Sequence, residues 1–463
     1  MEEKRRSSFS GSIGFVLAAA GSAVGLGNLW RFPYLAAQYG GGIFLLVYLV
    51  LVLTFGFSLL LLEIAIGRKT KKSAIHAYGE LDKRFSFLGY IAAIVPIIIL
   101  PYYSVIGGWV IKYMMAFFTG EGRVAAEADY FGNFVSQEAS PIVYFLVFLL
   151  LTTVIVIGGV EKGIEKVSVV LMPILVLISI GVCIFVTTIP GAGAGIKYYL
   201  LPDFSKFSFK TICGAMSQMF YSMSIAMGIM ISYGSYVKKN IDLNHSVNHI
   251  ELFDTLIALL AGFMIIPAVY VYSGEEALQK SGPGLMFQTL PVVFEKMPAG
   301  QLIGSLFFIL VLLAALTSSI SIMEAVASIF MDKFHIQRKT AVLITFAISV
   351  VLGVPSSMGN GAWSHITLLK MDFLSFFDFM SNSILMPIVA FLTCVLVGWV
   401  VKTKTVEDEI TLNGEKFGRR SIFRVMVRYI APICLVVILV FNILGLLYSY
   451  LGEQLPFLKF FII

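Results

Sequence analysis

Two apolar stretches of the chain contain runs of small and hydroxylated residues at points where a regular helix would be weakened. The first run is Gly21-Ser22-Ala23-Val24-Gly25-Leu26-Gly27-Asn28, and the second is Ser222-Met223-Ser224-Ile225-Ala226-Met227-Gly228. Each glycine weakens a helix by about 1 kcal/mol relative to alanine. Where such a helix unwinds, its carbonyl oxygens suit a hard cation, and the N–H groups of a half-helix N-terminus suit a carboxylate. The two runs therefore indicate a cation site beside a site for an anionic substrate, although small residues also serve close helix packing.

The composition requires that lipid forms part of the solvent. Of the 463 residues, 58% are hydrophobic and only 13% are charged, whereas soluble domains carry about 25% charged residues. A soluble fold could not bury so much apolar surface. The 33 Lys and Arg residues are dispersed over short loops, which excludes a nucleic-acid surface. No enzyme is expected, because the chain has no nucleophile elbow or phosphate loop, and the pair His245 and His249 lacks the glutamate of a zinc protease.

Eleven apolar runs are long enough to cross about 30 Å of hydrocarbon. The two weakened runs lie in the first and the sixth of them, which hold the same place in two five-helix halves. This placement predicts an all-α membrane protein with a 5+5 inverted repeat, unwound first and sixth helices and an additional eleventh helix. Unwound backbone at this depth must line a polar cavity. The expected spans are 13–36, 41–66, 87–118, 141–158, 166–188, 212–236, 250–273, 300–330, 340–355, 373–400 and 425–449.

The basic residues predict the orientation of these spans. The loops on one side hold 23 Lys and Arg residues, and the loops and tail on the other side hold eight. The positive-inside rule therefore places the N-terminus in the cytoplasm and the C-terminus outside. Short tails and the lack of a glycosylation acceptor on the outer loops indicate a bacterial plasma membrane. The expected division is a cytoplasmic segment (1–12), the first five-helix repeat (13–200), the second repeat (201–402), a cytoplasmic loop (403–424), and the eleventh span with an extracellular tail (425–463).

Several motifs resemble those of the neurotransmitter:sodium symporter family. The segment 21–33, which ends in Leu29-Trp30-Arg31-Phe32-Pro33, is similar to the first-helix signature of that family. The resemblance covers the first ten spans in order and is closest to the bacterial amino-acid members with eleven spans. It implies a sodium-coupled symporter that imports an L-amino acid by alternating access. The further matching motifs are Glu63 with Gly67-Arg68, Pro101-Tyr102-Tyr103, residues 162–166, Gln218-Met219-Phe220-Tyr221-Ser222, Tyr233-Gly234-Ser235-Tyr236 and Leu316-Thr317-Ser318-Ser319.

The resemblance implies two sodium sites. Both would be built of oxygen atoms, which are the ligands that hard cations prefer. Without the resemblance, Thr317 and Ser318 would be interpreted as hydroxyls that bond back to their own helix. One site would use the carbonyls of Gly21, Val24 and Ala314 with the hydroxyls of Thr317 and Ser318. The other would use the Ala23 carbonyl, the Asn28 side chain, Ser222 and Asp254.

The resemblance also predicts that transport is independent of chloride. Relatives that need chloride place it near a Tyr, a Gln, two Ser and an Asn. This chain has Tyr48, Gln218 and Ser222, but Ala258 where the remaining hydroxyl would be and Asp254 where the Asn would be. The carboxylate would then take the place of the anion. The alternative is that Asp254 is a charge near solvent at the cytoplasmic end of its span.

The expected substrate follows from a missing carboxylate. Relatives that transport amines carry an Asp where this chain has Gly25, so the negative charge is expected to come from the substrate. Met227, at a position where many relatives have Phe, favours large hydrophobic or aromatic side chains because a thioether is flexible. Leu26 and Gly27 amides and the Tyr103 hydroxyl would bind the carboxylate. The side-chain pocket would comprise Ile99, Tyr221, Met227, Ser318 and Ile322, with Ser22, Ala23, Ser222, Ser224 and Ala226 beside it.

Two charged pairs are expected to act as gates. Arg31 and Asp378 would form the outer pair above Tyr103 and Tyr221, and Asp372 is a rival partner. Arg6 and Asp332 would form the inner pair. Without the resemblance, the inner pair would be interpreted as ordinary charges beside the membrane. Phe9, Tyr233 and Ser235 are expected near the inner pair. Gly163 and Pro173 are expected to unwind the fifth span, although a proline at mid-span often only kinks its helix.

The expected partners are an amino acid and the lipid bilayer, with no nucleic acid. Two other functions are compatible with the same motifs: an amino-acid sensor that does not transport, and a proton-coupled transporter of the same fold. The uncharged oxygen set around Thr317 and Ser318 favours sodium over a proton.

Overall fold

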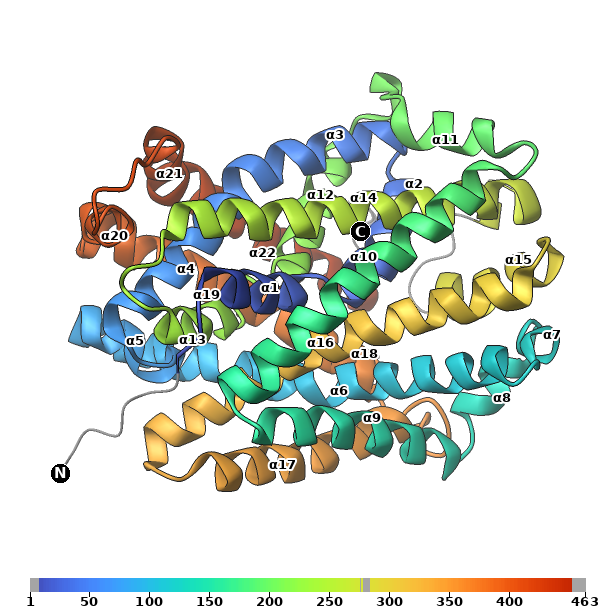
Figure 1. Cartoon of the computed structure of the whole chain (residues 1–463), viewed down its shortest axis with the longest axis horizontal. Coiled ribbons are helices and arrows are strands. Elements are labelled where there is room, and N and C mark those ends of the chain that lie inside the picture. Colours follow the sequence, from blue (N-terminus) through green and yellow to red (C-terminus); the bar gives the residue numbers. More distant parts are fainter. Residues whose placement is uncertain (1–7, 275, 278–283, 452–463) are drawn as a thin grey trace.

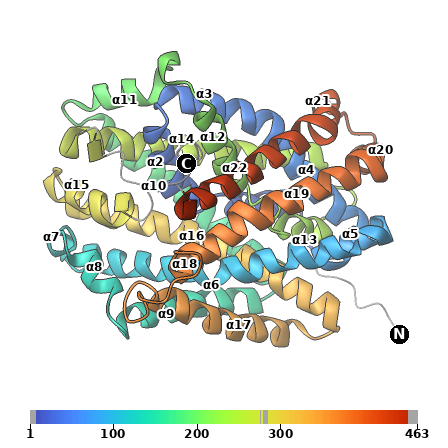
Figure 2. The same cartoon turned by 180° about the vertical axis from the view of Figure 1, so that it is seen from behind.

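The computed structural model describes residues 8–274, 276–277 and 284–451, and within these residues the chain is helical and contains no β-strand. Two isolated bridges, Gly41 with Pro202 and Leu368 with Met371, are the non-helical pairings in this part of the chain. Long helices lie side by side in an elongated bundle, and the short helices gather at its two ends (Figure 1). Seen from behind, α19 (Met386–Val395) and α22 (Ala431–Leu451) lie along the outside of this bundle (Figure 2).

The helices agree in part with the expected spans. Among the described residues, nine helical stretches are long and apolar enough to cross a membrane. A bent pair, Ser12–Ala23 with Gly27–Gln38, would make a tenth, with an angle of 48° between its halves. The expected sixth span is divided into two helices that are each too short to cross alone. The nine stretches are Gly42–Thr70, Lys83–Phe118, Ser140–Ile157, Val160–Thr187, Leu243–Ser273, Gly300–Phe334, Arg338–Met358, Phe373–Val400 and Arg420–Tyr448.

Three of these stretches, Gly42–Thr70, Phe373–Val400 and Arg420–Tyr448, each combine two α-helices joined by a π-helical turn. The other α-helices in chain order are α1 (Ser12–Ala23), α2 (Phe32–Gln38), α3 (Gly42–Leu51), α4 (Phe57–Thr70), α5 (Ala74–Leu81), α6 (Ser86–Phe118), α7 (Gly122–Ala125), α8 (Tyr130–Val135), α9 (Ser140–Ile157), α10 (Lys166–Thr187), α11 (Ala192–Leu200), α12 (Phe209–Ser222), α13 (Ile229–Tyr236), α14 (Leu243–Ser273), α15 (Leu290–Lys296), α16 (Gly300–Phe334), α17 (Arg338–Met358), α18 (Phe373–Asp378), α20 (Lys404–Ile410) and α21 (Arg420–Val425). The π-helical turns are η1 (Gly27–Arg31), η2 (Val52–Gly56), η4 (Val160–Glu165), η7 (Leu285–Thr289), η8 (Phe379–Leu385), η9 (Leu396–Val400) and η10 (Met426–Ile430). Single 3-10 turns, η3 (Lys83–Phe85) and η5 (Phe204–Lys206), precede α6 and α12.

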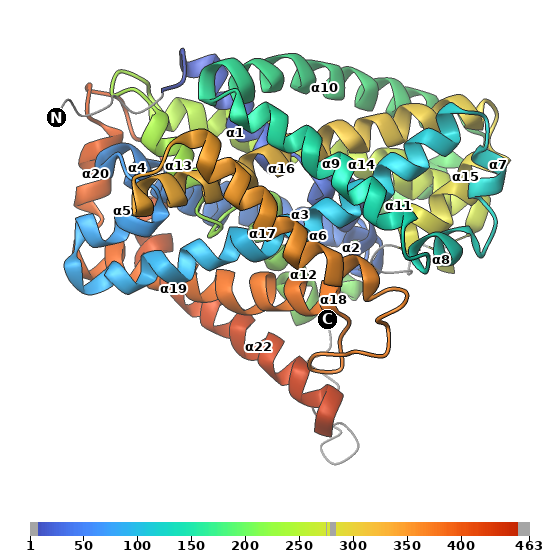
Figure 3. The ribbon, with the colours of Figure 1, turned by 90° about the horizontal axis from the view of Figure 1, so that it is seen from below.

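The connecting segments gather at two opposite ends of the molecule. The short helices α5 and α20 and the start of α1 lie at one end, and α7, α8, α11 and α15 lie at the other (Figures 1 and 3). The first group of short helices belongs to the loops that hold 23 Lys and Arg residues, and the second group belongs to the loops that hold eight. The fold therefore separates the basic loops from the less basic ones.

The first and sixth helices are both broken, as the glycine-rich and serine-rich runs predict. Helix α1 ends where Val24 turns to an extended conformation (φ −76°, ψ 103°). Helix α12 begins with a capping box between Ser208 and Thr211 and ends at Ser222. Residues 223–228 then form no helix, and φ is positive at Ser224 (53°), Ala226 (63°) and Gly228 (70°). A positive φ costs a non-glycine residue about 1–2 kcal/mol, so the surrounding structure must hold this segment in place.

The fifth span differs from the expectation that it unwinds between Gly163 and Pro173. Gly163 lies in the π-helical turn η4, and α10 continues without a break through Pro173. Proline removes one backbone hydrogen bond and bends a helix, and here the helix accommodates that loss.

An arginine at the end of α4 attaches the loop 403–424 to the bundle. The Arg68 side chain has no exposed surface, and its Nε donates to Glu409 Oε1 at 2.7 Å. Its Nη1 donates to the Ile241 carbonyl at 2.6 Å, and its Nη2 donates to the Glu409 carbonyl. In the same loop, burial tends to raise the pKa of Glu407, but the neighbouring Arg424 and Arg420 hold this pKa below its ordinary value. The loop is therefore fixed by arginine–carboxylate pairs.

The Arg68–Glu409 pair gives a test of this attachment. Glu409→Gln is expected to lower the stability of the protein by about 3 kcal/mol, because it leaves a buried guanidinium without a counter-charge. The measurement is the unfolding temperature of the purified protein in detergent. Arg84→Gln is the control, because its partner Asp82 lies in an exposed pair that contributes little to stability. An unchanged unfolding temperature for Glu409→Gln would contradict the assignment.

Candidate functional site

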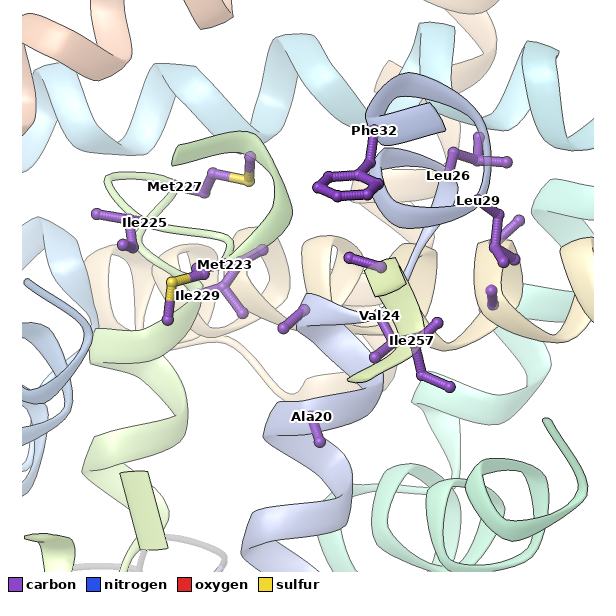
Figure 4. Packing of buried hydrophobic residues seen from close by; sticks show 14 of the residues in the cluster. Ala20, Val24, Leu26, Leu29, Phe32, Met223, Ile225, Met227, Ile229 and Ile257 are labelled. Atoms are coloured by element: carbon purple, nitrogen blue, oxygen red, sulfur yellow. The ribbon is translucent and has the colours of Figure 1, made fainter. Parts of the chain in front are cut away.

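The two helix breaks face each other in the middle of the bundle. Figure 4 shows Val24, Leu26 and Leu29 around the first break and Met223, Ile225 and Met227 on the second. A pair of serines connects the breaks. Ser22 Oγ donates to Ser224 Oγ at 3.3 Å, and Ser224 Oγ donates to the Ser22 carbonyl at 3.1 Å.

Side chains, most of them from other helices, satisfy the backbone groups at the breaks. The Ala226 N–H donates to Glu63 Oε1 at 2.7 Å, and the Gly25 N–H donates to Asn28 Oδ1 at 3.0 Å. Gln218 Nε2 donates to the Gly27 carbonyl at 2.8 Å. The Leu26 N–H lies 3.3 Å from the Tyr103 hydroxyl oxygen, which accepts its hydrogen bond. The breaks are thus built into the fold.

A first cluster of oxygen atoms lies where α16 crosses the first break. Ser318 Oγ donates to three carbonyls of the first span, those of Ser22 (3.0 Å), Val24 (3.2 Å) and Gly21 (3.4 Å). Thr317 instead bonds back to its own helix, at 3.0 Å from the Ala314 carbonyl. The structure thus brings all five residues of the first predicted sodium site to one place. This donor set holds only uncharged oxygen atoms, which fit a monovalent hard cation.

A second cluster surrounds Asp254, which is 0% exposed. Asn28 Nδ2 donates to Asp254 Oδ1 at 2.8 Å, and Ser222 Oγ donates to the same atom at 2.7 Å. The Tyr48 hydroxyl donates to Asp254 Oδ2 at 3.3 Å. The alternative position of Asp254 near solvent is therefore wrong, because the side chain is enclosed beside the first break.

The composition of this second cluster also fits a cation. It combines one carboxylate with the Asn28 amide and the Ser222 hydroxyl and holds no thiol or imidazole; in this structure the Asn28 amide oxygen accepts the Gly25 N–H. Ala23, the remaining member, lies at the adjacent cavity. Gln218 Oε1 is buried there and accepts no hydrogen bond from the described residues. Ala258, one helical turn after Asp254, is fully buried and offers no hydroxyl.

A small cavity of about 20 Å³ lies between the two breaks, α6 and α16. The residues of the predicted substrate set line it except Ala226, whose N–H bonds to Glu63, and Ser222, whose hydroxyl donates to Asp254 instead. Gly25 lines the cavity as well, and a Cβ there would lie 2.4 Å from Ser318 Oγ and 2.9 Å from the Tyr103 hydroxyl. No Asp, Glu, Lys, Arg or His is among its lining residues, which are Ser22, Ala23, Gly25, Leu26, Gly27, Ile99, Tyr103, Tyr221, Ser224, Met227, Ser318 and Ile322.

The outer pair is not closed in this structure. Arg31 donates to the Ser217 hydroxyl at 2.8 Å and to the Ser217 carbonyl at 3.1 Å, whereas Asp378 accepts from Asn382 at 2.6 Å. Arg31 and Asp378 make no ion pair within the described part of the chain, because other partners hold both side chains. Both line a cavity of about 410 Å³, together with the rival Asp372. The sequence analysis did not predict Ser217 as the partner of Arg31. Asn382 could have been predicted as a partner of Asp378, because it follows Asp378 by four residues on one helix.

The inner pair is described only in part, because Arg6 lies outside the described residues. Asp332 Oδ2 accepts the Ser73 N–H at 2.7 Å. Phe9 is buried, and its ring packs against Tyr233 at 5.6 Å and Tyr236 at 6.3 Å between centroids. Ser235 donates to the Ser232 carbonyl at 2.5 Å, so its hydroxyl is engaged within α13.

Sequence reasoning missed a buried charged cluster near this inner end. Glu324 is 0% exposed, pairs with Arg338 at 2.5 and 2.8 Å, and accepts the Tyr236 hydroxyl at 2.6 Å. An acidic residue inside an apolar run is a signal for function in a membrane helix, and it could have revealed this cluster.

The chain is similar to known proteins over nearly its whole length. A model of the family described as "Sodium:neurotransmitter symporter family" matches residues 6–126 and 133–455. An uncharacterized sodium-dependent transporter of Haemophilus influenzae is 33% identical over 457 residues, which cover 95% of this chain and 99% of that protein. The sodium-dependent transporter YhdH of Bacillus subtilis, likewise uncharacterized, is 32% identical over 454 residues, which cover 96% of this chain and 100% of the relative.

A solved structure is similar over nearly the whole fold. The crystal structure of MhsT in complex with L-phenylalanine has a TM-score of 0.85 and 33% identity, and the match covers 94% of this chain and 99% of MhsT. The helical bundle with its broken first helix is thus the fold of a multi-pass membrane transporter. The family match and the relatives together show that the chain belongs to the sodium:neurotransmitter symporter family.

Proposed function

We propose that this chain is a sodium-coupled symporter that imports an L-amino acid with a hydrophobic or aromatic side chain, without a requirement for chloride. The observation that carries the proposal is the difference in charge between the lining of the cavity and the adjacent cluster around Asp254. The cavity is lined by no charged side chain, yet a buried carboxylate, Asp254, lies in the cluster next to it. A zwitterion would supply the missing negative charge through its own carboxylate.

The two oxygen clusters are the proposed sodium sites. The first comprises Gly21, Val24, Ala314, Thr317 and Ser318, and the second comprises Ala23, Asn28, Ser222 and Asp254. Bound sodium would supply the positive charge that offsets the carboxylate of the substrate. The Leu26 and Gly27 amides and the Tyr103 hydroxyl would orient that carboxylate, because all three line the cavity.

We further propose the arrangement in the membrane and the path through it. The broken stretches would count as the first and sixth of eleven spans, in two inverted five-helix repeats (13–200 and 201–402), with the loop 403–424 and the segment 425–463 following. The end with α5 and α20 would face the cytoplasm, so that the N-terminus is inside and the C-terminus outside. Arg31 with Asp378 and Arg6 with Asp332 would close the two ends alternately.

The proposed substrate class rests on the shape of the cavity. Met227, Ile99 and Ile322 provide its apolar wall. A cavity of about 20 Å³ has space for roughly one water molecule, so these side chains must move to admit an amino acid, and the Met227 thioether moves easily. L-Phenylalanine in the similar MhsT structure supports an aromatic substrate.

Sodium coupling is tested with purified protein in liposomes. An inward sodium gradient is expected to accumulate labelled L-phenylalanine inside the vesicles, and a potassium gradient of equal size is not. Competition by the twenty amino acids then identifies the preferred side chain. Binding without accumulation would favour a sensor, and accumulation driven by a proton gradient alone would favour proton coupling.

Independence from chloride is tested by replacing chloride with gluconate. Uptake by the unmodified protein is expected to persist, because Asp254 already supplies the negative charge. Asp254→Asn is expected to lower uptake about tenfold or more, because replacing a residue that supports a metal site lowers metal affinity or activity by about that factor. Asp254→Asn combined with Ala258→Ser is expected to recover uptake in chloride but not in gluconate. Loss of uptake by the unmodified protein in gluconate would refute the proposed role of Asp254.

The role of Met227 is tested by Met227→Phe. The rigid ring is expected to weaken competition by L-phenylalanine and L-tryptophan about tenfold relative to L-valine, because it would occupy space that large side chains need. A change of even one methylene group in a hydrophobic pocket alters discrimination between substrates by about tenfold or more. Met115→Phe is the matched control, because Met115 lies on α6 with 42% of its surface exposed. An unchanged order of competitors for Met227→Phe would exclude Met227 from the pocket wall.

A further inference from the structure

Arg419, at the end of the loop 403–424, connects two helices that flank the candidate site. Its guanidinium forms a bidentate pair with Glu251 of α14, at 2.7 Å (Nη2 to Oε2) and 3.1 Å (Nη1 to Oε1). Nη2 also donates to Asn248 Oδ1, and the guanidinium carbon lies 3.4 Å from the centre of the Phe57 ring. The side chain is only 27% exposed.

The same guanidinium satisfies a carbonyl that the π-helical turn η2 leaves free. The N–H of Phe57 bonds to the carbonyls of Val52 and Thr54 and bypasses that of Leu53. Arg419 Nη1 donates to this Leu53 carbonyl at 3.0 Å. A backbone carbonyl without a partner is costly in hydrocarbon, so the π-helical turn depends on the hydrogen bond from Arg419 to Leu53.

Both helices that Arg419 contacts lead directly to the candidate site. On α14, Glu251 precedes Asp254 by three residues, which places it about one helical turn away. On the other side, Gly56 ends the π-helical turn, and a Cβ there would lie 2.5 Å from Met223 Sδ and 3.1 Å from Met219 Sδ. Met223 begins the non-helical segment of the second break. A displacement of either helix would therefore reach Asp254 or the second break.

From these contacts we infer that Arg419 is a positioning residue for the proposed sodium site. It fixes the position of the α14 turn that carries Asp254 relative to the π-helical turn η2. The inference rests on the proposed function of Asp254. Arg419 touches neither Asp254 nor the cavity, so it acts through its contacts with α14, at Glu251 and Asn248, and with the second span, at Leu53 and Phe57. A loop between two spans would thus determine how tightly an ion binds in the middle of the bundle.

The same loop offers a matched control. Glu407 forms a bidentate pair with Arg424, with both contacts at 2.7 Å, and it also pairs with Arg420 at 3.2 Å. This pair joins α20 to α21 and makes no hydrogen bond with α14 or η2. Arg424→Gln therefore removes an arginine–carboxylate pair from the loop and leaves the two connections to the site intact.

The experiment compares Arg419→Gln, Arg419→Lys and Arg424→Gln in the purified full-length protein by two measurements. The first is amide hydrogen exchange of the peptides that contain 52–57 and 248–256, without sodium. The second is the sodium chloride concentration that gives half of the sodium-induced rise in unfolding temperature, with choline chloride keeping ionic strength constant. Arg419→Gln is expected to accelerate exchange about tenfold in both peptides and to raise the half-maximal sodium concentration about tenfold.

Arg419→Lys is expected to give smaller shifts in the same direction, since lysine keeps the charge and loses the bidentate geometry. It also serves as the test if Arg419→Gln does not fold. Arg424→Gln is expected to match the unmodified protein in both measurements. The inference is overturned if the Arg419 variants change neither quantity, if they change exchange without changing the sodium dependence, or if Arg424→Gln has the same effects.

The experiment also separates this inference from the proposed function. If sodium does not raise the unfolding temperature of the unmodified protein, the proposed sodium sites fail. The exchange measurement, made without sodium, still decides whether Arg419 holds the two helices together.

Discussion

Inside hydrocarbon, a backbone N–H or carbonyl that leaves a helix must find another partner within the protein. The two helix breaks obey this constraint with partners from different helices. Glu63 of α4 accepts the Ala226 N–H, Tyr103 of α6 accepts the Leu26 N–H, and Gln218 of α12 donates to the Gly27 carbonyl. These helices must pack around the breaks, because their polar side chains are needed there. The constraint that allows the site to exist therefore also organises the bundle.

Buried charges obey a related constraint, since an ion moved out of water is costly unless it is paired and hydrogen-bonded. Glu324 is paired with Arg338, and Arg68 with Glu409. Asp254 differs from these, because its described partners are the neutral groups of Asn28, Ser222 and Tyr48. A carboxylate that receives only neutral donors has no counter-charge among its described partners, and in this respect Asp254 differs from Glu324 and Glu409.

The sequence predicted the breaks and the family because both depend on local residue types. Three glycines near Asn28 weaken the first helix directly, and the motifs around Tyr103 and Ser318 stand in a characteristic order. The family assignment is confirmed. Partners that are distant in sequence could not be predicted in this way. Nothing near Arg31 indicates that Ser217 holds its guanidinium.

The burial of Arg68 has a consequence for the synthesis of the chain. Its guanidinium needs the Ile241 carbonyl and the Glu409 carboxylate, and Glu409 follows 341 residues later. Until residue 409 has been translated, the Arg68 guanidinium lacks the carboxylate that pairs with it in the folded structure. A truncated product would keep this uncompensated arginine. Completion of the polypeptide is thus coupled to the stability of one of its earliest helices.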